Sequence, residues 1–185
     1  MKKFMMVLVA AVGVMVFAKS SNAAEPSSPK WFQVTSPNGF EVQLPGEPKI
    51  TRKEVPTDDG PLSTETEVQV LYEKTAYRVS TKHIEGLSKD NKATLLREAG
   101  QHFISSAEKL QAKVLLSRQI SLSNVSGLES RLELPDGTIR HFRFFIVGDR
   151  MHMLRVTGPA AEVALPATVR FLDSFTLKEV GPVKK

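Results

Sequence analysis

Strict alternation of apolar and polar side chains is the feature that most restricts how this chain can fold. It is clearest in residues 62–73, where one face would carry Leu62, Thr64, Thr66, Val68, Val70 and Tyr72. Successive side chains of a β-strand point to opposite faces, so this period predicts a strand with one buried face and one face in water. A chain that repeats the pattern is built mainly from half-buried strands.

Segments of this kind recur from residue 31 onwards and are separated by turn residues. Pro45-Gly46-Glu47-Pro48 ends one strand, because two prolines cannot donate hydrogen bonds to a ladder. Asp58-Asp59-Gly60 and Asp136-Gly137 are typical of hairpin turns. Strands this close in sequence favour antiparallel pairing. Besides residues 62–73, we expect strands at 31–35, 40–44, 50–55, 76–84, 114–123, 128–134, 138–147, 151–157 and 175–177.

The strand expected at residues 138–147 has apolar side chains on both faces. Phe142, Phe144 and Ile146 point one way, whereas Phe145 and Val147 point the other. A strand of this kind is covered on both faces, so we expect it in the interior of a sheet.

Two segments have a helical period instead. Residues 160–172 form a short helix interrupted by Pro166. Residues 90–113 form a longer one with Asp90 as its N-cap and an apolar stripe centred on Phe103. The stripe comprises Leu95, Leu96, Ala99, Phe103, Ala107 and Leu110. The order of elements predicts an α+β fold: a single antiparallel β-sheet with a long helix and a shorter C-terminal helix packed on it.

The N-terminus has the pattern of a secretory signal peptide. Lys2 and Lys3 precede an apolar run from Phe4 to Ala18, and Ser21-Asn22-Ala23 provides small residues for cleavage. As a helix, the run would measure roughly 22 Å, short of a hydrocarbon core of about 30 Å. We therefore expect a signal peptide at 1–23 and a periplasmic or secreted protein without a stable membrane span. An uncleaved N-terminal anchor is the alternative.

The remaining chain is expected to comprise a disordered spacer at 24–30, one domain at 31–178 and a flexible tail at 179–185. Cleavage would remove Lys2, Lys3 and Lys19, leaving 22 of the 25 basic residues against 20 acidic ones, a net charge of +2. So small an excess predicts no nucleic-acid partner. The absence of cysteine excludes disulfides, thiol catalysis and zinc–cysteine sites.

Two stretches resemble the PsbP-like family, which includes the extrinsic photosystem subunit and exported bacterial relatives. The first is Trp31 with the run from Asn38 to Pro48, and the second is the run from Phe171 to Leu177. The aromatic strand before Gly148-Asp149-Arg150 is also similar. The resemblance implies an antiparallel sheet flanked by helices and a role in assembly or docking. It implies no catalytic residues.

Other side-chain groups have simple structural explanations. Glu98, His102 and Ser106 lie one helical turn apart, but a mid-helix column provides no oxyanion donors and does not converge on one reacting atom. The histidines (His83, His102, His141 and His152) lack the spacing of metal ligands. We therefore predict no catalytic residue, no metal and no cofactor.

The best candidate docking surface is the first long hairpin. Glu65 and Glu67 point outward near Arg52 and Lys53, and the turn adds Asp58 and Asp59. Ordinary cross-strand ion pairs explain the same charges. Our leading hypothesis is an exported, non-enzymatic module that docks an envelope or secreted protein. The alternatives are a small-ligand binder with a pocket between sheet and helix, and an unrecognised hydrolase.

Overall fold

The computed structural model describes residues 28–57, 60–84 and 91–178. Its helices are α1 (Lys92–Lys109), α2 (Ala160–Val163) and α3 (Pro166–Asp173). Its strands are β1 (Trp31–Ser36), β2 (Phe40–Pro45), β3 (Lys49–Thr57), β4 (Gly60–Tyr72), β5 (Thr75–His83), β6 (Lys113–Leu122), β7 (Val125–Glu133), β8 (Thr138–Val147), β9 (Arg150–Pro159) and β10 (Thr176–Leu177). Each expected strand is present, with ends shifted by a few residues.

Seven strands form one antiparallel sheet in the order β3-β4-β5-β9-β8-β7-β6. Tight turns join most neighbours, and Gly137 and Gly148 take the positive φ angles that two of these turns require. β5 and β9 are far apart in sequence but pair from Ala76↔Thr157 to His83↔Arg150. This pairing joins the N-terminal and C-terminal halves of the sheet.

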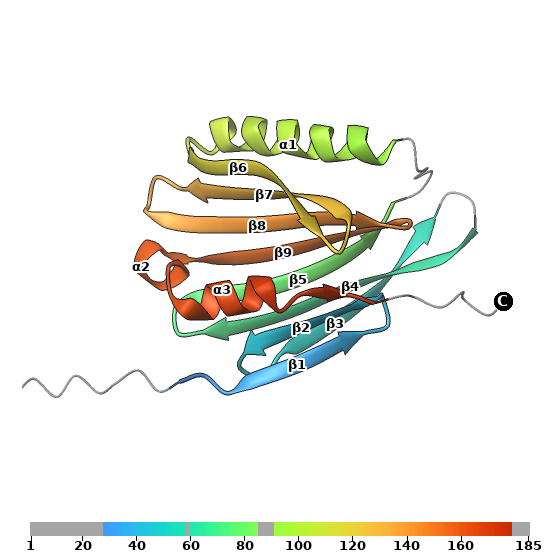
Figure 1. Ribbon diagram of the computed structural model, residues 1–185, viewed down its shortest axis with the longest axis horizontal. Coiled ribbons are helices and arrows are strands. Elements are labelled where there is room, and N and C mark those ends of the chain that lie inside the picture. The colour runs from blue at the N-terminus through green and yellow to red at the C-terminus, as the bar shows by residue number, and fades with distance from the viewer. Residues whose placement is uncertain (1–27, 58–59, 85–90, 179–185) are drawn as a thin grey trace, which may run out of the picture.

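The remaining strands form a second sheet in the order β1-β2-β10 (Figure 1). The prediction of a single sheet with a long helix and a shorter helix on it is therefore wrong. β2 pairs with β1 on one side and with β10 on the other, so β3 has no place beside it. The Pro45–Pro48 turn allows the chain to leave one sheet and start the other. Strands dominate the described part of the chain, where the longest helix has 18 residues.

The second sheet covers one face of the seven-stranded sheet, which we call the sandwich face. Asn38, in the β1–β2 turn, is buried; its Nδ2 donates to Thr66 Oγ1 at 2.7 Å, and Arg150 donates to its Oδ1 at 2.7 Å. Figure 1 shows α3 and the small sheet in front of β9, β5 and β4. The main core lies between these layers and includes Phe40, Leu44, Val68, Tyr77, Val79, Leu154, Phe171 and Phe175.

Helix α1 packs on the opposite face, which we call the helix face. Phe103 is buried and meets Phe142 of β8 edge to face, with ring centroids 5.4 Å apart. Ala107 and Leu132 complete this smaller core. Phe145 is buried in the main core, so β8 is covered on both faces, as predicted.

The helices differ in detail from the expected ones. α1 begins after Asn91, which makes no side-chain capping hydrogen bond, and ends at Lys109, whereas the predicted cap, Asp90, lies outside the described residues. Leu110 follows the helix and is exposed, because the chain turns there towards β6. The C-terminal helix is split at Pro166 as expected: Leu165 has an extended ψ of 155°, and α3 begins at the proline.

Candidate functional site

An ion cluster lies on the sandwich face of β6, β7 and β8, beyond the part that the second sheet covers. Glu129 of β7 is only 1% exposed. Its Oε2 accepts from Arg118 Nε at 2.8 Å, and its Oε1 accepts from Arg143 Nε at 2.8 Å. His141 Nε2 lies 3.1 Å from Oε1. The register places Arg118 and Arg143 directly opposite Glu129, so β-pairing assembles the cluster.

Arg143 also joins the sheet to the end of α3. Its Nη1 donates to Asp173 Oδ1 at 2.8 Å and to the carbonyl oxygen of Leu172 at 3.0 Å. Carbonyls in the last turn of a helix have no partner within the helix, so this contact satisfies one of them. The arginine therefore holds α3 against strand β8.

The cluster keeps fixed charges at neutral pH. Burial alone would raise the pKa of Glu129, but hydrogen bonds from Arg143 and Arg118 lower it to about 2. Burial lowers the pKa of His141, although its contact with Glu129 acts in the opposite direction. A carboxyl group with so low a pKa holds no proton to exchange near pH 7, so Glu129 is unsuited to general acid–base catalysis.

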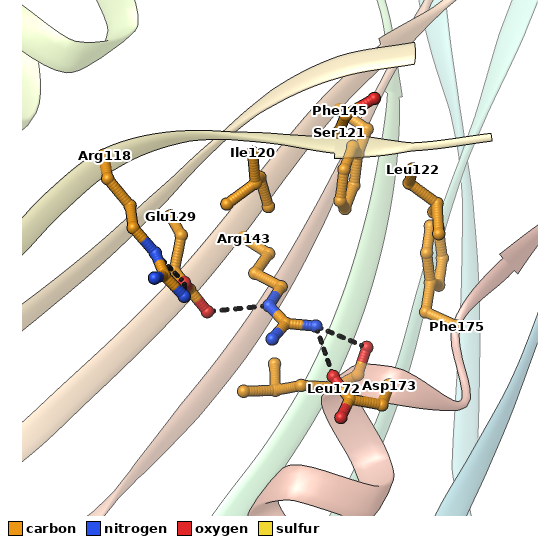
Figure 2. Close-up of a pocket in the computed structure, with 10 residues that line it drawn as sticks. All are labelled: Arg118, Ile120, Ser121, Leu122, Glu129, Arg143, Phe145, Leu172, Asp173 and Phe175. Atoms are coloured by element: carbon orange, nitrogen blue, oxygen red, sulfur yellow. Dashed lines mark hydrogen bonds and ion pairs between the residues drawn. The ribbon is translucent and has the colours of Figure 1, made fainter. Parts of the chain in front are cut away.

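A hollow of about 370 Å³ lies beside the cluster, between the β6–β7 hairpin and the end of α3. Figure 2 shows Arg118 and Glu129 at one end, with Arg143 reaching from Glu129 towards Asp173. Asp173 lies beside Arg143, and the other walls are apolar or small: Ile120, Ser121, Leu122, Phe145, Leu172 and Phe175. A charged end and an apolar body are the features of a ligand pocket.

The acidic side chains predicted to form a docking surface occupy the helix face, at the end that α1 leaves uncovered. Glu65 lies opposite Lys53 on β3 and forms an ion pair with Lys82 of β5 at 3.8 Å. Glu67 forms an ion pair with Arg78 at 3.1 Å. The predicted neighbour Arg52 lies on the sandwich face, because it pairs with Thr66. Asp58 and Asp59 lie outside the described residues.

Basic side chains dominate this uncovered area, which we call the open face. The register aligns Lys49, Gln69, Arg78 and Arg155 in one row across β3, β4, β5 and β9. Burial lowers the pKa of Arg155, and the charges of Arg78 and Arg140 lower it further, which indicates crowded guanidinium groups. The open face has six basic and two acidic side chains, which gives a net charge of +4. The basic ones are Lys49, Lys53, Arg78, Lys82, Arg140 and Arg155, and the acidic ones are Glu65 and Glu67.

The column on α1 shows no sign of a catalytic site. Glu98 and His102 are exposed, and no hydrogen bond links Glu98, His102 and Ser106 in the described part of the chain. Glu98 and His102 line a hollow of about 290 Å³ between α1 and the sheet, whose other walls are mainly apolar. A ligand pocket between sheet and helix stays a prediction at this hollow.

Two further features are absent from residues 28–57, 60–84 and 91–178. No group of three or more His, Asp or Glu side chains there is placed to hold a metal ion. No helix there is long and apolar enough to cross a membrane.

His152 lies in the main core, away from the ion cluster. It is 1% exposed, its Nδ1 lies 3.0 Å from Thr81 Oγ1, and its ring meets Phe40 edge to face. Burial, together with the nearby charge of Arg150, lowers its pKa from 6.5 to about 4. The unfolded chain therefore binds a proton between pH 6.5 and 4 that the folded chain does not bind, so stability falls as the pH falls through this window.

We expect wild type to lose roughly 3 kcal/mol of unfolding free energy through His152 between pH 6.5 and 4. His152→Gln keeps a hydrogen-bonding group near Thr81 but does not titrate, so it should remove most of this slope and leave the part due to His141. Urea unfolding at a series of pH values measures the effect. Parallel pH profiles for wild type and variant would show that His152 is not held neutral.

Comparison with solved structures identifies the fold. The chain is similar to cyanobacterial PsbP (CyanoP) from Synechocystis sp. PCC 6803, with a TM-score of 0.53 and 13% identity, covering 86% of this chain and 98% of that one. A protein of unknown function from Pseudomonas aeruginosa aligns with a TM-score of 0.40 and 12% identity, covering 72% of this chain and 85% of that one. No family model and no curated protein matches the sequence. The chain therefore has a PsbP-like fold, and the predicted resemblance is confirmed.

Proposed function

We propose that this chain is an exported, non-enzymatic docking module that binds an acidic envelope or secreted protein through its open face. Export is supported by the signal pattern of residues 1–23. The PsbP-like fold is compatible with a binding module. The observation that carries the proposal is the net charge of +4 on the part of the sheet that α1 leaves uncovered.

The arrangement of these charges favours a protein partner. Glu67 and Gln69 both hold Arg78, which fixes the direction of its guanidinium group. Arginine is enriched at protein interfaces because its planar group makes paired hydrogen bonds to carboxylates. Leu71 lies on the same face and is 73% exposed, so an apolar contact is available beside the charges.

The surface carries more positive charge than the fold needs. Cross-strand ion pairs account for Arg78 and Lys82, which face Glu67 and Glu65. Lys49, Arg140 and Arg155 form no ion pair within 4 Å among the described residues, although Glu67 lies near Arg155 and Asp136 lies near Arg140. Uncompensated charge of one sign steers a partner of the opposite sign and raises its association rate. An acidic partner fits this surface better than a basic one.

Charge variants on the open face test the proposal by opposite effects. Arg78→Gln with Arg155→Gln removes two positive charges and should slow association with the native partner by about ten-fold at low salt. Glu65→Gln with Glu67→Gln adds two net positive charges and should speed it. Surface plasmon resonance at two salt concentrations, using the partner captured from the native envelope, measures both rates.

Arg97→Gln on the exposed side of α1 is the matched control and should leave the association rate unchanged. Each variant should melt within a few degrees of wild type, because these positions are at least partly exposed. If the Glu65 and Glu67 variant slows association instead, the carboxylates themselves contact a basic partner. Equal rates for all variants would exclude this face.

A further inference from the structure

We infer that the hollow beside the ion cluster binds a small monocarboxylate with an apolar body. The site is separate from the open face, because Arg118, Glu129 and Arg143 lie on the sandwich face whereas Glu65 and Arg78 lie on the helix face. Its volume of about 370 Å³ falls within the range of small-molecule pockets, roughly 300–1,000 Å³.

Glu129 organises the charged end but takes no part in binding an anion. Both of its carboxylate oxygens accept hydrogen bonds, Oε2 from Arg118 and Oε1 from Arg143 and His141. A carboxylate paired in this way stays ionised and holds both guanidinium groups in place. Preorganised donors of this kind bind a ligand without a further ordering cost.

Each arginine keeps one amino group that its contacts with Glu129 and α3 do not use. Arg118 contacts Glu129 through Nε and Nη2, which leaves Nη1. Arg143 uses Nε for Glu129 and Nη1 for the end of α3, which leaves Nη2. Neither Nη1 of Arg118 nor Nη2 of Arg143 has a partner in the described part of the chain. Guanidinium groups recognise carboxylates through N–H donors of this type.

The charge balance selects a ligand with a single negative charge. Arg118 and Arg143 are offset by Glu129 and Asp173, so the lining is neutral overall. A dianion such as phosphate would meet two nearby carboxylates, whereas one carboxylate can use the two spare donors. The apolar walls, with Phe145 and Phe175 among them, then require an aromatic or aliphatic body on the ligand.

The experiment titrates 3-phenylpropionate into the purified chain. The readout is the change in NMR chemical shift of the Ile120 and Leu122 methyl groups. We expect saturable shifts, with binding at least about ten-fold weaker for the neutral 3-phenylpropionamide and for acetate, which lacks the body. Arg118→Gln should weaken binding by about ten-fold, because Arg118 is largely exposed and its loss leaves the fold intact. Arg97→Gln, on α1, should bind as wild type does.

A second variant protects the test against a fold defect in the first. Leu122 lies on the same face of β6 as Arg118 and lines the hollow, so Leu122→Trp should fill it and abolish the Ile120 shifts while the melting temperature stays within a few degrees. Equal binding of acid and amide, or binding unaffected by both variants, would overturn the inference. An absence of shifts at about 10 mM acid would also overturn it. None of these outcomes bears on docking, because no partner protein is present.

Discussion

Glu129→Gln is expected to destabilise the fold by about 3–5 kcal/mol, towards the lower end of that range. The carboxylate is 1% exposed and compensates two guanidinium groups, so the substitution leaves Arg143 partly buried without its main counter-ion. Arg118 is largely exposed and can return to water, which limits the loss. Urea unfolding at pH 7 measures the change. A loss below about 1 kcal/mol would show that the ion cluster does not stabilise the fold.

The same variant should change the response to acid. The pKa of Glu129 is about 2 in the folded chain and 4.5 in its usual range. The unfolded chain therefore takes up a proton between pH 4.5 and 2 that the folded chain does not, so stability is lost as the pH falls through this window. Glu129→Gln should flatten the profile there and leave the contribution of His152, between pH 6.5 and 4, in place.

Phe103→Ala should cost about 3–5 kcal/mol of unfolding free energy, the usual range for removing a buried phenylalanine. Phe103 is 7% exposed and makes an edge-to-face contact with Phe142. It is the largest side chain that α1 contributes to the smaller core, so its loss leaves a cavity between the helix and β8. Chemical denaturation followed by circular dichroism gives the value.

The neighbouring Ile104 is the matched control for this prediction. It lies on the same helix but is 44% exposed, so Ile104→Ala should cost less than about 1 kcal/mol. Comparable losses at both positions would contradict the observed packing of α1. A loss of less than about 1 kcal/mol of unfolding free energy in Phe103→Ala would also contradict this packing.

The strands and helices were predictable because local patterns specify them. The alternation in β4 places Val68 and Val70 in the core and Glu65 and Glu67 outside, as the register confirms. Pro166 divides the C-terminal helix as expected. The expected turn at 124–127 was less accurate, because β7 starts at Val125 and includes Gly127. A Cβ atom there would lie 2.6 Å from Phe145, a tertiary contact that a local pattern does not contain.

The division into two sheets was missed for a similar reason. β2 and β3 are separated by a short turn, and consecutive strands usually pair. Here β10 takes the place beside β2, although Thr176 and Glu41 are far apart in the sequence. Only a long-range pairing distinguishes a sandwich from a single meander, and alternation on its own is compatible with both.

The ion cluster was missed because its members come from separate strands. Arg118, Glu129 and Arg143 are unremarkable one by one, and pairing places them side by side. A signal existed in the sequence: Arg143 occupies the same face of its strand as Phe145, where an apolar residue is expected. A charged residue at a core-facing position predicts a partner charge nearby.

Site-specific photocrosslinking in the native envelope tests the docking proposal most directly. A photoreactive side chain at Ser80, on β5 between Arg78 and Lys82, reports contacts on the open face, and one at Gln33 of β1 reports the opposite side of the molecule. We predict that Ser80 captures an acidic segment of one protein, that Gln33 does not, and that Arg78→Gln with Arg155→Gln abolishes the product. Capture from Gln33 instead, or capture from Ser80 of a basic segment, would contradict the proposal.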